Sequence, residues 1–178
     1  MDGYVVHEEC DHIFFVGFNG IGKTTVARNI GTLFGRSWVD TDRLAERVCH
    51  ESVARVFETQ GEECFREAET RALRDLASRK SLLVACGGGV VERPENLEIM
   101  HSMGTVVYLK GELDYALSQI HSYERRPELK GAESVQEVFA RREPLYASAA
   151  DLVVHVEGKS FREVADEAVR LLWEEGLL

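Results

Sequence analysis

Basic residues are scarce relative to acidic ones in this sequence. Its 178 residues include 21 Lys and Arg against 31 Asp and Glu, which gives a formal net charge of −10. A nucleic-acid backbone calls for a basic surface, so we expect no nucleic-acid partner. A local basic pocket for a small anion remains compatible with this charge.

Long apolar runs are lacking as well. No stretch reaches the roughly 18 apolar residues of a membrane-spanning helix. The first residues, MDGYVVHEECDH, carry acids where a secretory signal peptide carries basic residues. We therefore expect neither a membrane span nor a secretory signal.

Cysteine and histidine form no metal-binding pattern. The six histidines show no ligand spacing, and no C-x-x-C pair occurs among the four cysteines, Cys10, Cys49, Cys64 and Cys86. These spacings argue against a zinc ion held by the protein. Scattered cysteines favour reduced thiols and a cytoplasmic location.

The remaining composition is that of an ordinary globular protein, with 44% hydrophobic and 29% charged residues. A chain of this length can form one domain that buries roughly 70% of its unfolded surface. We find no linker, internal repeat or low-complexity segment. Residues 1–178 are therefore expected to form one domain, with residues 1–11 as a short N-terminal extension.

Apolar strand-like runs alternate with helical segments along the chain. The expected strands are Ile13–Val16, Ser37–Val39, Leu82–Ala85, Thr105–Leu109 and Leu152–Val156. The expected helices are 25–33, 42 onward, 52–59, 62–78, 94–100, 112–120, 134–147 and 161–173. This order predicts an α/β fold, in which a parallel five-stranded sheet carries helices on both faces.

Three details of these helices are expected from local chemistry. Asp42 is expected to be an N-cap, because its carboxylate can accept from the first N–H groups of a helix. Pro144 is expected to kink its helix or end it early. The polar stretch His121–Glu133, which contains a proline and a glycine, is expected to be a mobile loop.

One stretch carries a specific phosphate-binding pattern. Ile13–Thr25 reads IFFVGFNGIGKTT, in which an apolar strand leads into G-x-x-x-x-G-K-[ST] and then a helix. Gly17 and Gly22 let backbone N–H groups approach phosphate oxygens, and the helix N-terminus adds positive charge. Lys23 is placed to reach the β- and γ-phosphates, and Thr24 to hold Mg²⁺.

Two further segments follow strands at the edge where this fold binds ligands. Asp40-Thr41-Asp42 supplies two carboxylates, which suit a metal hydration shell and a substrate hydroxyl. Gly87-Gly88-Gly89 lets backbone approach a ligand closely. Two plainer alternatives stay open, namely that Asp42 only caps a helix and that the glycines only form a tight turn.

Taken together, these motifs resemble those of the shikimate kinase family. The segments that carry the likeness are the D-x-D at Asp40–Asp42, Ser52–Phe57, Gly61-Glu62, Phe65–Glu69, Gly87–Val91, Arg126-Pro127 and Arg142–Tyr146. They occur in the family's order over nearly all of Ile13–Leu172. The resemblance implies a three-layer P-loop kinase fold. It also implies transfer of the γ-phosphate of ATP to the 3-hydroxyl of shikimate, with Mg²⁺ as cofactor.

The resemblance also implies site residues. Lys23, Asp42 and Arg126 would be catalytic. The nucleotide would be bound by Gly20, Ile21, Gly22, Lys23, Thr24, Thr25 and Arg126. Shikimate would be bound by Asp42, Arg66, Gly87, Gly88, Gly89 and Arg142, and the metal by Thr24 and Asp40. The partners would be ATP and shikimate only, the protein would be a monomer, and residues 121–133 would form a lid.

Arginine chemistry makes the implied substrate contacts sensible, because a planar guanidinium suits a carboxylate. Glu69 lies one helical turn after Arg66 and is placed to orient it. Each arginine also has a plainer alternative: an ion pair on a helix surface for Arg66, a solvated surface position for Arg142, and a solvated loop charge for Arg126.

One position departs from the family pattern. Gln119 stands where relatives carry an arginine that stacks on adenine, which leaves the adenine anchor in question.

Three other functions compete with this interpretation. A kinase of another hydroxylated acid, such as gluconate, would share the P-loop. A GTPase would need N-K-x-D and D-x-x-G, and neither occurs in the chain. A non-catalytic nucleotide-binding module would not need Lys23, Asp42 and Arg126.

Overall fold

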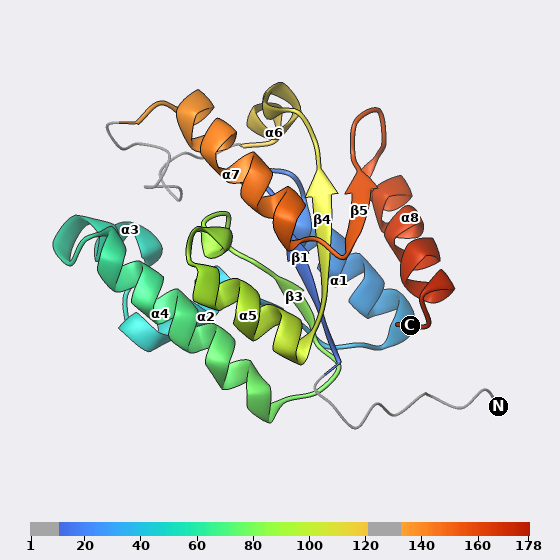
Figure 1. The fold of residues 1–178 in the computed structure, drawn as a ribbon, viewed down its shortest axis with the longest axis horizontal. Helices are drawn as coiled ribbons and strands as arrows, with labels where there is room; N and C mark the ends of the chain where they lie inside the picture. The colour runs from blue at the N-terminus through green and yellow to red at the C-terminus, as the bar shows by residue number, and fades with distance from the viewer. Residues whose placement is uncertain (1–10, 121–132) are drawn as a thin grey trace.

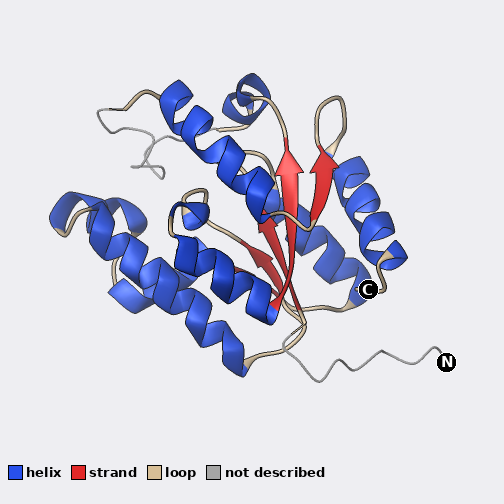
Figure 2. Ribbon diagram, viewed as in Figure 1, coloured by secondary structure: helices blue, strands red, loops and turns tan. Residues whose placement is uncertain are grey.

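The computed structural model describes residues 11–120 and 133–178. Its strands form a five-stranded sheet in the order β2-β3-β1-β4-β5, and every neighbouring pair is parallel. The bounds are β1 His12–Val16, β2 Trp38–Asp40, β3 Leu83–Ala85, β4 Gly104–Lys110 and β5 Leu152–His155. The predicted α/β fold with a parallel five-stranded sheet is confirmed, and Figures 1 and 2 show the strands enclosed by helices.

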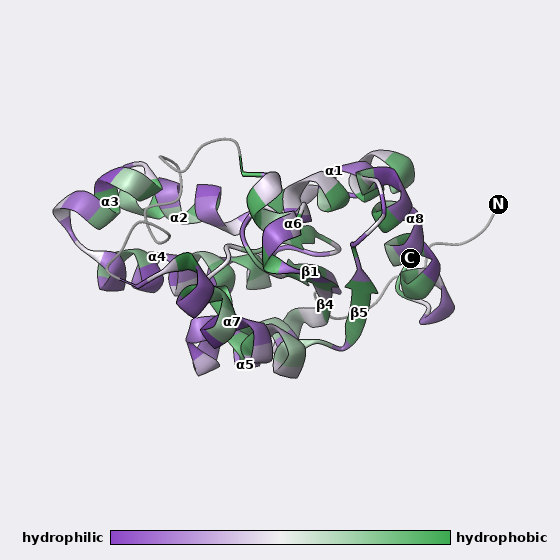
Figure 3. Ribbon diagram, turned by 90° about the horizontal axis from the view of Figure 1, so that it is seen from above, coloured by the Kyte–Doolittle hydropathy of each residue, from purple (hydrophilic) through white to green (hydrophobic). Residues whose placement is uncertain are grey.

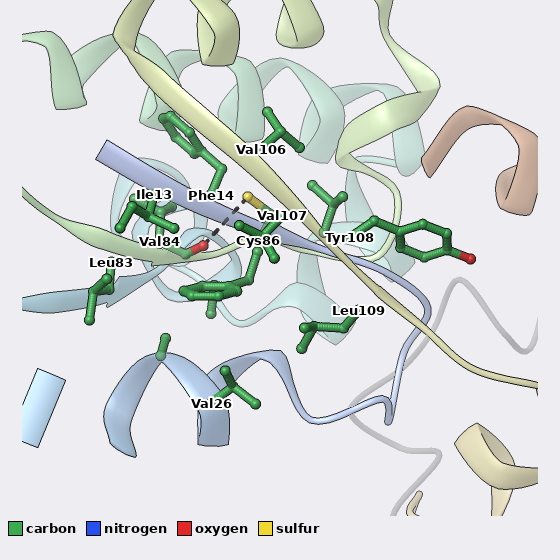
Figure 4. Packing of buried hydrophobic residues seen from close by; sticks show 14 of the residues in the cluster. Ile13, Phe14, Val26, Leu83, Val84, Cys86, Val106, Val107, Tyr108 and Leu109 are labelled. Atoms are coloured by element: carbon green, nitrogen blue, oxygen red, sulfur yellow. Dashed lines mark hydrogen bonds between the residues drawn. The ribbon is translucent and has the colours of Figure 1, made fainter. Parts of the chain in front are cut away.

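Strand β1 lies at the centre of the sheet, and all five of its residues are buried. It pairs with β3 on one side and β4 on the other, so that Phe14 lies beside Val84 and Val106. Figure 4 shows these side chains in the core together with Cys86, which is fully buried. A central strand without a polar face requires cover on both sides of the sheet, and this matches its continuous apolar run.

Helices supply that cover. Helix α1 packs on β3 and α8, while α5 and α7 pack on β4, and Figure 3 shows α1 on the opposite side of the strands from α5 and α7. The bounds are α1 Lys23–Phe34, α5 Pro94–Met103, α6 Leu113–Ser118, α7 Val135–Ala149 and α8 Phe161–Glu174.

A second, smaller core joins three helices beyond the β2 edge of the sheet. These helices are α2 Thr41–Cys49, α3 Val53–Thr59 and α4 Glu62–Asp75. Their buried contact consists of Ala45, Val56, Phe65 and Ala68. Figure 1 shows the three helices gathered at one end of the molecule, beside the loop that follows β3.

Three local expectations need correction. Asp40, not Asp42, is the N-cap of α2, and its carboxylate accepts from the N–H groups of Asp42 and Arg43. The long helix expected over residues 62–78 is α4 followed by a short 3₁₀ turn, Leu76–Ser78. Helix α7 continues through Pro144 to Ala149, so the expected early end is wrong, and a kink at the proline stays a prediction. The expected loop at 121–133 lies outside the described residues except for Glu133.

Among the described residues, no helix is both long enough and apolar enough to cross a bilayer.

Candidate functional site

The glycine-rich loop runs from the end of β1 to the start of α1. Gly22 is the N-cap of α1 with φ of 103°, a left-handed conformation that favours glycine. A Cβ on Gly22 would lie 2.5 Å from Cε1 of Phe161, and a Cβ on Gly17 would lie 2.7 Å from the carbonyl oxygen of Leu109. The loop therefore needs these two glycines for its own packing, in addition to any approach of phosphate.

Lys23 begins α1 directly after this loop. Its side chain is largely buried, with 9% exposed, and its Nζ donates to the carbonyl oxygens of Gly17 at 2.7 Å and Phe18 at 2.8 Å. These bonds hold the ammonium group against the backbone of the glycine-rich loop, next to the N-terminus of α1. Positive charge from Lys23 and from the helix N-terminus thus converges at one place, which suits a polyphosphate.

Thr24 and Asp40 meet between the P-loop helix and β2. The Thr24 hydroxyl donates to Oδ2 of Asp40 at 2.9 Å, while Oδ1 of Asp40 accepts from the N–H of Asp42 at 3.0 Å. Both groups offer oxygen atoms, the ligand type that Mg²⁺ prefers, so they fit this metal. Among the described residues no three His, Cys, Asp or Glu side chains gather as a metal site, and Mg²⁺ commonly keeps waters and phosphate oxygens as its other ligands.

The glycine triplet after β3 lies against the side chains that the sequence assigned to the substrate. A Cβ on Gly87 would overlap the carboxylate of Asp42, and one on Gly89 would overlap the guanidinium of Arg66. A Cβ on Gly88 would overlap the amide of Asn19. The backbone of the triplet therefore packs against side chains from three distant parts of the chain. Its expected close approach to a ligand stays a prediction.

Two hydrogen bonds fix this triplet in place. The N–H of Gly87 donates to Oγ1 of Thr41 at 2.8 Å. The hydroxyl of Tyr146 donates to the carbonyl oxygen of Gly88. The first bond ties the triplet to α2 and the second to α7, so the turn is anchored to helices on both sides.

Arg66 projects from α4 into a set of carboxylates. Only 5% of Arg66 is exposed, and its guanidinium donates to Glu69 at 3.0 Å and to Glu62 at 2.9 Å and 3.2 Å. Burial alone would lower the pKa of Arg66, but the charges of Glu69 and Glu92 raise it above its ordinary value. The pairing with Glu69 is the orientation that the sequence predicted, and Arg66 is not an exposed surface residue.

Arg142 reaches the same place from α7 and is 1% exposed. Its Nε and Nη2 donate to the two carboxylate oxygens of Glu92 at 3.1 Å and 3.3 Å, and its Nη1 donates to Oδ1 of Asn19 at 3.3 Å. Glu92 also lies 3.4 Å from Nη2 of Arg66. The two arginines are therefore joined through one carboxylate, and neither is a solvated surface side chain.

An open cavity of about 700 Å³ lies at the carboxyl ends of the strands. Its lining includes the P-loop and α1 start, the two carboxylates after β2, and the triplet, through Gly20, Gly22, Lys23, Thr24, Thr25, Asp40, Asp42 and Gly88. Gln119 and Phe161 line it as well. Arg66 and Arg142 are not among the described residues that line this cavity, although Gly89 of the triplet lies against the Arg66 guanidinium. Arg126 lies outside the described residues.

The structure adds Asn19 and Glu92, to which the sequence gave no role, and it gives a contact to Tyr146, which the sequence named only as the end of the segment Arg142–Tyr146. Asn19 and Glu92 are bound to Arg142, which is more than 40 residues away from either in the chain. Contacts of this range leave no local pattern. Tyr146 offered a weak signal, since it lies one helical turn after Arg142 and so shares its helix face.

Comparison with known proteins places these features in a family. A family model described as shikimate kinase matches residues 19–173. A shikimate kinase of Dictyoglomus turgidum is 37% identical over 163 residues, which cover 89% of this chain and 95% of that protein. The solved shikimate kinase of Acinetobacter baumannii in complex with shikimate superposes with a TM-score of 0.87 and 32% identity, over 94% of this chain and 95% of that one.

A gluconokinase of Sinorhizobium meliloti is also similar in fold. It superposes with a TM-score of 0.58 at 16% identity, over 94% of each chain. At this identity the likeness concerns the fold alone.

Proposed function

The chain belongs to the shikimate kinase family, and from that premise we propose how its cavity carries out the phosphorylation of shikimate by ATP. The observation that carries the proposal is that one cavity is lined both by Lys23 of the P-loop and by Asp42 beside the glycine triplet. ATP lies along the P-loop, and the acceptor lies between Asp42 and the triplet. The phosphate donor and the acceptor hydroxyl then meet within one space.

The reaction moves the γ-phosphoryl group of ATP to the 3-hydroxyl of shikimate. The hydroxyl oxygen forms a bond to phosphorus, the bond from phosphorus to the β–γ bridging oxygen breaks, and ADP leaves. Asp42 accepts a hydrogen bond from the attacking hydroxyl and takes its proton. Lys23 stabilises the negative charge on the phosphoryl oxygens in the transition state.

Substrate position is set by the residues around the glycine triplet. Arg66 and Arg142 bind the carboxylate of shikimate, while Gly87, Gly88 and Gly89 present backbone groups to its ring. Burial of both guanidinium groups supports this assignment, since a charge-assisted hydrogen bond is stronger away from water. Arg126, outside the described residues, is assigned to the transferring phosphoryl group.

Thr24, through its hydroxyl, and Asp40, through its carboxylate, are the residues that would hold Mg²⁺. Mg²⁺ supplies charge that offsets the phosphate oxygens when it is bound. Their mutual hydrogen bond supports the assignment, because it keeps both oxygens beside the P-loop.

An assay for ADP release tests the proposal. ADP should form rapidly with shikimate, and at background rate with gluconate or with no acceptor. Lys23→Ala should lower kcat by about two to three orders of magnitude, as expected for loss of one transition-state charge contact. Equal rates with and without shikimate would refute the assignment of substrate, and near-normal turnover of a folded Lys23→Ala would refute the role of the lysine.

A further inference from the structure

The arginines assigned to the substrate carboxylate already bind a carboxylate of this chain. Glu92 ends the 3₁₀ turn Val90–Glu92, directly after the glycine triplet. Its oxygens accept from Nε and Nη2 of Arg142, the edge of the guanidinium that matches a carboxylate in two parallel bonds. The same group lies 3.4 Å from Arg66. Glu92 thus occupies the donors that an incoming carboxylate would need.

The charge of the cluster leaves little attraction for another anion. Arg66, Arg141 and Arg142 contribute three positive charges. Their carboxylate partners are Glu62, Glu69, Glu92 and Glu133. Among the described residues four acids thus surround three bases, so an added carboxylate gains a strong ion pair with these arginines when one of the resident acids withdraws.

Glu92 is the acid best placed to withdraw. Glu69 is fully buried on α4, and Glu62, although half-exposed, pairs with Arg66 and, among the described contacts, not with Arg142. Glu92 is 17% exposed and has a third partner at the surface, because its Oε1 accepts from Nε and Nη2 of Arg141 at 3.0 Å and 2.7 Å. Arg141 is an exposed residue of α7 and gives the carboxylate a place at the surface.

We propose that Glu92 is a specificity-determining residue: it competes with the substrate carboxylate for Arg142 and Arg66, and when a carboxylate-bearing substrate binds it releases both and keeps its bonds to Arg141. This inference rests on the proposed function, because it takes the two arginines as the substrate carboxylate site. The competition lowers the affinity for shikimate. It also makes the favourable free energy of binding depend on a ligand carboxylate that can replace Glu92.

The test compares Glu92→Gln with a matched control, Glu95→Gln. Glu95 lies three residues later, on α5, and pairs with Arg74 and Arg93. Calorimetry gives the Kd of shikimate and of its uncharged methyl ester, and kinetics give the KM for ATP. In Glu92→Gln the Kd of shikimate should fall by about 10-fold, since one charge-assisted pair no longer competes. The Kd of the ester and the KM for ATP should stay unchanged, and Glu95→Gln should alter none of the three.

An unchanged or raised Kd of shikimate in a folded Glu92→Gln would overturn the inference; a raised Kd would make Glu92 a group that positions the arginines. If Glu92→Gln does not fold, Arg141→Gln provides a second test at an exposed position. Loss of the surface partner should hold Glu92 on Arg142 and raise the Kd of shikimate about 3-fold. An unchanged Kd in Arg141→Gln would contradict the proposed movement.

Arg142→Gln separates this inference from the proposed function. A large rise in the Kd of shikimate in Arg142→Gln, with no fall in that Kd in Glu92→Gln, would overturn only the competition by Glu92. The proposed carboxylate site would then stand. An unchanged Kd in Arg142→Gln would refute the carboxylate site itself, and with it the inference.

Discussion

The hydroxyl of Tyr146 on α7 donates a hydrogen bond to the carbonyl oxygen of Gly88, in the turn after β3. Both groups are buried, and burial raises the pKa of Tyr146, so the hydroxyl remains a neutral donor. The bond joins the helix that carries Arg142 to the glycine triplet. It therefore links two parts of the proposed shikimate site that are 58 residues apart in the sequence.

Tyr146→Phe should remove this bond while keeping the ring, which packs on Tyr108 at 5.5 Å between centroids. The carbonyl of Gly88 would lose its partner in a buried place, at a cost of about 1–3 kcal/mol in the free energy of unfolding. Urea unfolding measures this directly. A loss below about 0.5 kcal/mol, the range of ordinary surface substitutions, would show that the triplet is held by other contacts.

Arg66→Ala should raise the KM for shikimate by about 10- to 150-fold, which corresponds to one charge-assisted interaction of about 1.5–3 kcal/mol. The KM for ATP should change little. Arg74→Ala on the same helix is a matched control, because Arg74 pairs with Glu95 at the surface. Steady-state kinetics with each substrate varied in turn check the prediction. An equal rise in both KM values would remove Arg66 from the shikimate site.

Acid should weaken the structure through Glu92. Burial would raise the pKa of this group, but hydrogen bonds to Arg142 and Arg141 and the charge of Arg66 together lower it below its ordinary value of 4.5. The Glu92 carboxylate therefore takes up a proton at a higher pH in the unfolded chain than in the folded protein. The contribution of ionised Glu92 to the free energy of unfolding is present above pH 4.5 and is lost as the pH falls through the lowered pKa. Urea unfolding of the wild type and Glu92→Gln across this range measures the effect. A stability difference between them that is constant with pH would contradict it.

The sequence predicted the fold and the P-loop because both follow from local patterns. Apolar strands alternating with helices specify a parallel sheet, and β1, Gly17–Gly22 and α1 are continuous in the chain. The sequence prediction for the helix cap was wrong by two residues, since Asp40 and Asp42 are both acceptable caps and only the backbone distinguishes them. The engagement of Arg142 by Glu92 was missed because it depends on side chains that meet only after the sheet has formed. The catalytic and binding roles of the site residues stay predictions.

The adenine contact is where this chain departs from the family pattern that it resembles. Gln119 and Phe161 both line the cavity, and the Phe161 ring lies over Gly22 of the P-loop. An arginine at position 119 would offer a flat, charged guanidinium to the base, whereas the glutamine amide is uncharged. Phe161 begins α8 and brings an aromatic ring to the lining of the same cavity. We therefore expect Phe161 to supply much of the stacking that Gln119 does not.

Two substitutions test whether Phe161, and not residue 119, provides the stacking on adenine. Gln119→Arg should lower the KM for ATP several-fold with little change in kcat, because a cation–π contact contributes about 0.5–2 kcal/mol. Phe161→Ala should raise the KM for ATP by about 5- to 150-fold, since stacking of a base on an aromatic ring is worth about 1–3 kcal/mol.

His121 and Tyr123, outside the described residues, are the alternative stacking groups. If Phe161→Ala leaves the KM unchanged while His121→Ala or Tyr123→Ala raises it, the anchor belongs to that segment. If Gln119→Arg also leaves it unchanged, the base does not approach position 119, because a guanidinium within reach of the ring would strengthen binding whichever residue covers the other face.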